Sequence, residues 1–467
     1  MSLITLVLSA SLLYIFCYRK LTVKKRYLML LAMTCAVEIL NMGAPFFKFG
    51  TASVSSMIVF ESMLFIYSFK LLKNIRVSTK LFFWCSLFIL LCILGVSLEI
   101  IFPYEKPIVN HSTYLAWDGV FWGLSSKSML EISWGWEALI FYKVVFFLSE
   151  LVVISQIIDL KDLRYLLRLI TKIVYIDVYV GIAEFLFTYF VPILSTPFHF
   201  LIQGGNSTEN IARYDVLGLS GLESEPSHFI ITLFMLSLCM FIINKSNQKT
   251  VYRWYHFLPI YFLMIVSTGF SVVFLLPMSI LCYLIIKLFN QSVSIRKVMT
   301  TSAIVIFILV AFYILINYLS ENYVYIHSKL EYTQFALEYI LSGGTFYASP
   351  YTSSSYARLV SIYDTFGDFI ERPLLGLGLG IETSHGGLMN VLSFIGLSGI
   401  ITLYFLIHRA LPKGIIKVDK KLLFFYVCIV NLPLELYISG FQIAHFIIYA
   451  STALYMTQSK EGDSHHE

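Results

Sequence analysis

The chain has 467 residues, of which 58% are hydrophobic, 16% are aromatic and only 13% are charged. Soluble domains carry about a quarter of charged residues, and a mean hydropathy of +0.79 is too high for a surface in contact with water. This composition excludes a soluble globule and argues against nucleic-acid binding, a disulfide scaffold and intrinsic disorder. The sequence therefore predicts an all-α, polytopic membrane protein that forms one domain over residues 1–467.

Apolar runs long enough to cross a bilayer as helices recur along the whole chain. About 13 membrane-spanning helices are predicted. The range runs from about 11 to 14, because the tight hairpins at 257–288 and 422–456 can also be read as long tilted helices. The predicted spans are 2–18, 27–47, 53–69, 81–102, 136–159, 173–194, 228–243, 257–268, 271–288, 298–319, 388–407, 422–437 and 441–456.

The Lys and Arg residues predict the orientation, because they concentrate in cytoplasmic loops. Every second loop is basic, and these loops with the C-terminal tail hold 25 of the 33 Lys and Arg residues. The N-terminus is therefore expected outside and the C-terminus in the cytoplasm, with no cleavable signal peptide. The basic segment 161–172 is expected at the cytoplasmic surface, as a topology anchor against anionic lipid headgroups.

Three segments on the outward side are long, namely 103–134, 195–227 and 320–387. A transporter usually keeps such loops short, whereas an enzyme at the outer membrane face builds its site from them. All seven cysteines fall inside predicted spans, so neither disulfides nor a CxxC metal site is expected.

Arginine is scarce in the outward segments, and two of the three lie in informative contexts. Arg213 precedes a polar stretch that leads into the 228–243 span. Arg358 lies near the start of an amphipathic helix with apolar 3,4-spacing, which is predicted to begin at 353–355 and to end before Pro373. A helix N-terminus and a guanidinium together favour an anion at that point.

A histidine and two acids add to this set of outward residues. Gly376, Gly378 and Gly380 do not have the spacing of a dinucleotide-binding motif; they are expected to let a loop bend and bring His385 to the mouth of the 388–407 span. Glu223 and Glu225 lie in the preceding outward segment. Each residue alone fits an ordinary interface role, but together they suit a pyrophosphate, which favours Arg, and a sugar hydroxyl, which needs a base.

Acids also occur inside predicted spans, and intramembrane charge can mark an ion pathway. A transporter is therefore a rival from a different functional class, although Lys143 can neutralise one of the acids. The acids are Glu38, Glu61, Glu137, Glu150, Asp177, Glu184 and Glu435.

Three passages resemble the O-antigen polymerase and ligase superfamily of bacterial membrane glycosyltransferases. The first is Gly221-Leu222-Glu223-Ser224-Glu225-Pro226-Ser227, similar to the family's Gly…Glu-Pro-Ser element that enters a span. The second runs from Ala357-Arg358-Leu359 to Gly378. The third is Ser384-His385 followed by Gly396-Leu397-Ser398-Gly399, although Gly386 stands where many members have Asn.

The resemblance implies a Wzy-like polymerase at the periplasmic face of the bacterial inner membrane. It would move a growing chain from undecaprenyl pyrophosphate onto the next lipid-linked repeat, with Arg213 and Arg358 on the pyrophosphate and His385, Glu223 or Glu225 as the base. The expected partners are the lipid-linked oligosaccharide, the bilayer and a chain-length regulator. No metal, cofactor, nucleotide sugar or nucleic acid is expected. The alternatives are a ligase that transfers glycan to lipid A–core and a lipid-linked sugar or ion-coupled transporter.

Overall fold

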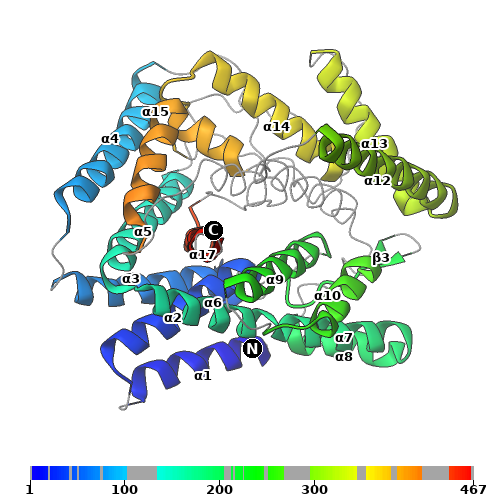
Figure 1. Ribbon diagram of the computed structural model, residues 1–467, viewed down its shortest axis with the longest axis horizontal. Coiled ribbons are helices and arrows are strands. Elements are labelled where there is room, and N and C mark those ends of the chain that lie inside the picture. Colours follow the sequence, from blue (N-terminus) through cyan, green and yellow to red (C-terminus); the bar gives the residue numbers. More distant parts are fainter. Residues whose placement is uncertain are drawn as a thin grey trace.

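Helices make up most of the chain in the computed structural model, in agreement with the predicted helical fold (Figure 1). The structure describes residues 3–18, 21–40, 45–49, 52–73, 77–102, 134–203, 212–213, 216–223, 226–246, 251–267, 295–343, 354–379, 387–412 and 441–463. The first helices are α1 (Leu3–Cys17), α2 (Val23–Leu40), α3 (Ser56–Leu72), α4 (Thr79–Ile101), α5 (Trp134–Ile157), α6 (Leu160–Val174), α7 (Ile176–Tyr189) and α8 (Ser195–Gln203). They are followed by α9 (Pro226–Ser246), α10 (Trp254–Val266), α12 (Ile295–Asn322), α13 (Val324–Leu341), α14 (Ser354–Glu371), α15 (Gly387–Ala410) and α17 (Ile443–Asp463).

Two short antiparallel hairpins interrupt the helices. Strands β1 (Pro45–Phe49) and β2 (Ala52–Ser55) pair with each other, as do β3 (Ala212–Arg213) and β4 (Val216–Leu217). The prediction of one apolar helix over 27–47 was wrong at its end, because α2 stops at Leu40 and β1 follows. Proline explains the difference, since Pro45 lacks an amide donor and disfavours helix in the residue before it.

The other predicted spans coincide with helices over most of the residues that the structure describes, with three qualifications. The 53–69 run begins in β2, and its helix, α3, starts only at Ser56. The 173–194 run begins inside α6, and a break at Tyr175 separates α6 from α7. The predicted spans 271–288 and 422–437 lie outside the described residues. The amphipathic helix expected between 353 and Pro373 is confirmed as α14.

Within the described residues, three helical segments are long and apolar enough to cross a membrane: Thr79–Ile101, Ala138–Ile157 and Val391–Ala410. They belong to α4, α5 and α15. Shorter apolar helices occur at Leu3–Cys17, Pro192–Ile202, His228–Asn244, Trp254–Val266 and Ile443–Ala453.

Helix α6 lies in the central group of packed helices. It contacts α2, α9 and α17, and α17 is seen end-on beside them in Figure 1. Its buried face consists of Leu163, Leu166, Leu167, Ile170, Thr171 and Val174, whereas Lys161, Arg168 and Lys172 are exposed. The 161–172 segment is thus an amphipathic helix. Its basic side is exposed, and its apolar side belongs to the core.

Candidate functional site

The first of the three family-like passages begins in a buried turn between α7 and α9. Glu223 donates its amide to the carbonyl of Ser220 at 3.0 Å, and Gly221 has a φ of +58°. A Cβ at position 221 would lie 2.5 Å from Asp177 Oδ1 and 2.6 Å from the Phe229 ring. Only glycine fits, because both the backbone conformation and the space exclude a side chain.

Two carboxylates on α7 hold this turn through its backbone. Glu184 accepts from the amide of Ser220 at 3.0 Å and from the amide of Gly221 at 2.7 Å, and the Ser220 hydroxyl lies 3.3 Å from the same carboxylate. Asp177 Oδ1 accepts from the amide of Leu222 at 2.8 Å. Three consecutive amides therefore point at acids seven residues apart, which lie on one face of the helix.

The turn places Glu223 in the protein interior at the start of α9. Its side chain is 0% exposed and lies close to Asp177 and Thr232. His199 of α8 approaches the same acids, with Nε2 3.4 Å from Glu184 Oε1. Burial lowers the pKa of His199, so the imidazole is neutral at pH 7.

The sequence singled out Glu223 but did not connect it with Asp177, Glu184 or His199. The available signal was the seven-residue interval between Asp177 and Glu184, which puts both acids on one helix face. His199 had no comparable signal, because its contact with Glu184 exists only after α8 folds back against α7.

The second and third passages pack against each other through backbone hydrogen bonds. Leu377 N donates to Ser393 O at 2.6 Å, and Leu397 N donates to Pro373 O at 2.8 Å. Gly376 and Gly396 have φ values of +71° and +60°, and Gly396 interrupts the helical conformation of α15. The expected bend at the glycines is confirmed at Gly376 and also at Gly378, which has a φ of +110°.

Arg372, the third arginine of the predicted outward segments, fixes this glycine-rich turn to α4. Its guanidinium contacts Glu99 at 2.5 Å and donates to the carbonyl of Phe102 at 2.8 Å. A Cβ at Gly95 of α4 would lie 3.4 Å from Gly378 Cα, so the two backbones approach closely. Arg372 therefore has a structural partner on another helix.

The remaining predicted site residues are only partly described. Arg213 belongs to β3, and Arg358 is the fifth residue of α14, but their side chains are not among those described. Glu225 and His385 lie outside the described residues. The proximity of the two guanidinium groups, on which the pyrophosphate hypothesis depends, stays a prediction.

Several of the acids inside the predicted spans have polar partners in the described part of the chain. Glu61 forms an ion pair with Lys143, the neutralisation expected for one acid. Glu150 accepts from the hydroxyl of Tyr27 at 2.8 Å, and Glu38 accepts from the amide of Ala444 at 2.7 Å. Among the described residues, no group of three or more His, Cys, Asp or Glu side chains is arranged to hold a metal ion.

Comparisons of the chain with protein family models, with curated proteins and with solved structures found no match.

Proposed function

We propose that this chain is a polytopic membrane glycosyltransferase that polymerises lipid-linked oligosaccharide repeats. The observation that carries the proposal is the anchored turn at 220–223, which leads into α9 where the resembling family has its Glu-Pro-Ser element. The contact between the second and third family-like passages supports it further, because segments that resemble one family also meet in space.

The membrane setting of the proposal rests on exposed apolar side chains as well as on the three long apolar helices. Large apolar residues are exposed along α4, α10 and α12, including Phe82, Leu258 and Phe307 at 64%, 57% and 72%. Surfaces of this kind are typical of contact with lipid. The bacterial inner membrane, with the N-terminus in the periplasm and the C-terminus in the cytoplasm, is the proposed location.

In the proposed reaction, the sugar–phosphate C1–O bond of the donor breaks, and the acceptor hydroxyl of the next repeat forms the new bond to C1. Undecaprenyl pyrophosphate leaves with the electron pair, stabilised by Arg213 and Arg358. His385, Glu223 or Glu225 takes the hydroxyl proton. The leaving group is a stable anion, so the proposed reaction needs no metal.

The decisive test replaces each arginine and measures polymer length in cells and in a reconstituted reaction. Arg213→Ala and Arg358→Ala should each lower the elongation rate by about 10²–10³, since they remove a charge contact made mainly in the transition state. Arg372→Lys, which retains the positive charge beside Glu99, is the matched control and should still make long chains. Normal chain lengths in both alanine variants would refute the pyrophosphate role.

The same reconstituted reaction examines the base and the metal. His385→Ala should slow elongation of a defined lipid-linked repeat, and unchanged elongation would assign base catalysis to another residue.

EDTA should have no effect; a loss that Mg²⁺ restores would contradict the metal-independent reaction. A deletion strain that attaches no repeat at all to lipid A–core, rather than single repeats, would indicate a ligase instead.

A further inference from the structure

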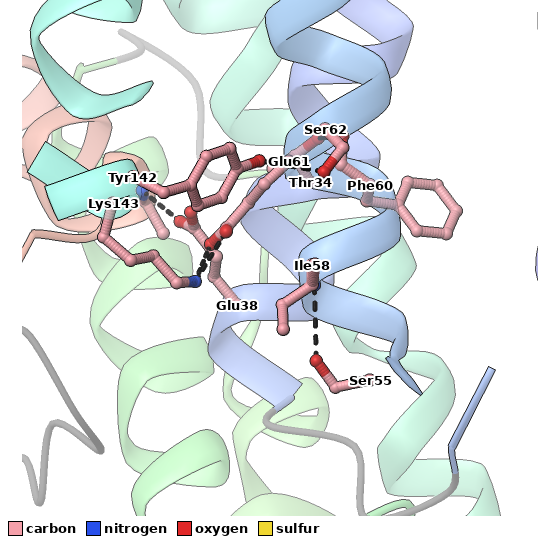
Figure 2. A network of polar contacts seen from close by, with 10 residues as sticks. Thr34, Glu38, Ser55, Ile58, Phe60, Glu61, Ser62, Tyr142 and Lys143 are labelled. Carbon is pink, nitrogen blue, oxygen red and sulfur yellow. Dashed lines mark hydrogen bonds and ion pairs between the residues drawn. The ribbon is translucent and has the colours of Figure 1, made fainter. Parts of the chain in front are cut away.

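A second polar cluster lies in the core and involves helices α2, α3, α5 and α17. Figure 2 shows Glu38, Glu61 and Lys143 pointing toward one another from α2, α3 and α5. Their exposed fractions are 2%, 0% and 2%. None of the three belongs to the machinery of the proposed function, so the cluster needs its own explanation.

The charges of this cluster do not balance if both carboxyl groups are ionised. Lys143 bonds both oxygens of Glu61, which leaves Glu38 as a second buried acid without its own cation. An uncompensated charge in a protein interior is costly. The neighbouring titratable groups Tyr142, Cys35 and Glu150 supply no positive charge. Within the part of the chain that the structure describes, a further titratable side chain close to Ala444 is the buried His445, the next residue on α17.

The hydrogen bonds of Glu38 show where an additional positive charge fits. Its Oε2 accepts from the amide of Ala444 at 2.7 Å. Its Oε1 is buried and takes no hydrogen bond from the protein atoms that the structure describes, yet the Glu38 and Glu61 carboxyl groups lie within hydrogen-bonding reach of each other. Ionised carboxylates only accept hydrogen bonds, so two of them need a proton or a cation between them.

We propose that Glu38 and Glu61 form a buried proton-binding site, with the proton on Glu38 Oε1 and donated to the Glu61 carboxylate. The carbonyl oxygen of the neutral Glu38 then accepts from Ala444, and the cluster of two acids and one ammonium has no net charge. A proton fits better than a metal ion, because metal ions take several oxygen ligands and the described residues offer no such group. The bound proton thereby links α2 and α3 to the N-terminus of α17.

The experiment is infrared spectroscopy of the full-length protein in detergent at pH 7. Because other acids are buried as well, among them Glu150 and Asp177, the readout is the difference spectrum of the wild type minus Glu38→Gln, which should contain the C=O band of one protonated carboxyl group. Glu99→Gln, which removes a buried acid already paired with Arg372, should retain it, and so should His445→Gln. A difference spectrum without such a band overturns the proposal.

Thermal unfolding gives a second readout that does not depend on the infrared band. Folding takes up the proton at any pH where an unfolded glutamate is ionised, so the wild-type midpoint should fall as pH rises from 5 to 8 by more than that of Glu38→Gln. Equal pH dependence in both proteins contradicts the site. A wild-type midpoint that instead rises with added Na⁺ at constant pH, with no response in Glu38→Gln, assigns the position to sodium.

Discussion

One side chain, that of Glu184, supplies the hydrogen-bond acceptors for two consecutive amides of the turn at 220–223. Its two carboxylate oxygens receive the amides of Ser220 and Gly221, and Asp177 receives the next amide along the chain. Charged acceptors form stronger hydrogen bonds than neutral ones, and buried amides left unsatisfied are costly. The two α7 acids therefore act as positioning residues for the segment that precedes Glu223.

Replacing Glu184 by glutamine tests this role. In glutamine an NH₂ group replaces one of the two carboxylate oxygens. This donor faces the N–H of Ser220 or Gly221, which then has no acceptor, so the free energy of unfolding should fall by about 1–3 kcal/mol. Chemical unfolding in detergent measures the change. Glu338→Gln on α13, where the acid accepts from Gln334, is the control and should stay within about 0.5 kcal/mol. Equal stabilities for the two variants would contradict the anchoring role.

Glycines decide how α15 meets the segment that follows α14. A Cβ at Gly376 would lie 2.2 Å from Ser393 O, and one at Gly396 would lie 2.5 Å from the Leu374 carbonyl carbon. Gly396 has φ +60° and ψ −167°, a conformation that residues with side chains avoid. The break in α15 thus depends on this residue having no side chain.

Alanine substitutions at two glycines distinguish backbone strain at Gly396 from the general loss of chain flexibility that any change from glycine to alanine causes. Gly396→Ala should destabilise the protein by about 1–3 kcal/mol from backbone strain alone, and the blocked contact adds to it. Gly367→Ala in α14, where no atom lies within 4 Å of the new Cβ, should stabilise the helix by about 0.5–1 kcal/mol. Thermal unfolding of both variants measures the contrast, and destabilisation by Gly367→Ala of the same size would refute the explanation.

The start of α6 depends on a charged cap. Asp159 accepts from the amides of Lys161 and Asp162, and Asp162 returns a bond to the Asp159 amide. The amide of Asp162 is the main cause of the lowered pKa of Asp159, and Lys24 contributes. A lowered pKa means that this stabilisation is present above the ordinary Asp pKa of about 3.9 and disappears as the pH falls through the folded value.

Asp159→Ala should therefore cost about 1 kcal/mol at pH 7, and the difference from the wild type should shrink as the pH falls below the ordinary Asp pKa and through the lowered folded pKa of Asp159. Unfolding curves at several pH values measure it. Asp159→Asn is the control, because asparagine also caps helices, and it should lose little at pH 7. A deficit in Asp159→Ala that persists unchanged at low pH would assign the effect to packing.

The arrangement of the protein as a whole combines a packed interior with an apolar exterior. Helices α2, α6, α9 and α17 contact one another in the interior, while α4, α10 and α12 expose large apolar side chains. Both observations fit the proposed membrane location, in which lipid surrounds the helices. The pattern of basic loops then predicts which end of each helix faces the cytoplasm.

Reporter fusions test that orientation directly. Alkaline phosphatase fused after Gly343, in the 320–387 outward segment, should be active because it reaches the periplasm. The same enzyme fused after Ser246, in the basic 244–256 loop, should be inactive, and green fluorescent protein should give the opposite result at both positions. Active phosphatase at Ser246 would reverse the proposed topology.

Helix positions followed from local patterns, since apolar run length and caps act over a few residues. The α14 helix was predicted within about one turn from its apolar spacing and from Pro373. The end of α2 was not predicted, because hydropathy outweighed the effect of Pro45 in the 27–47 run. For the candidate site, the chain itself identified Glu223 and the glycine-rich turn but not the side chains that hold them.

The amino-acid order alone establishes a helical chain with apolar stretches and alternating basic loops, because each of these properties belongs to neighbouring residues. The folded structure decides what each buried charge contacts. Glu184 meets Ser220 36 residues away, Arg372 meets Glu99 273 residues away, and Glu38 meets Ala444 406 residues away. No local pattern encodes such pairs: a buried acid must find a donor, but packing determines which donor is within reach.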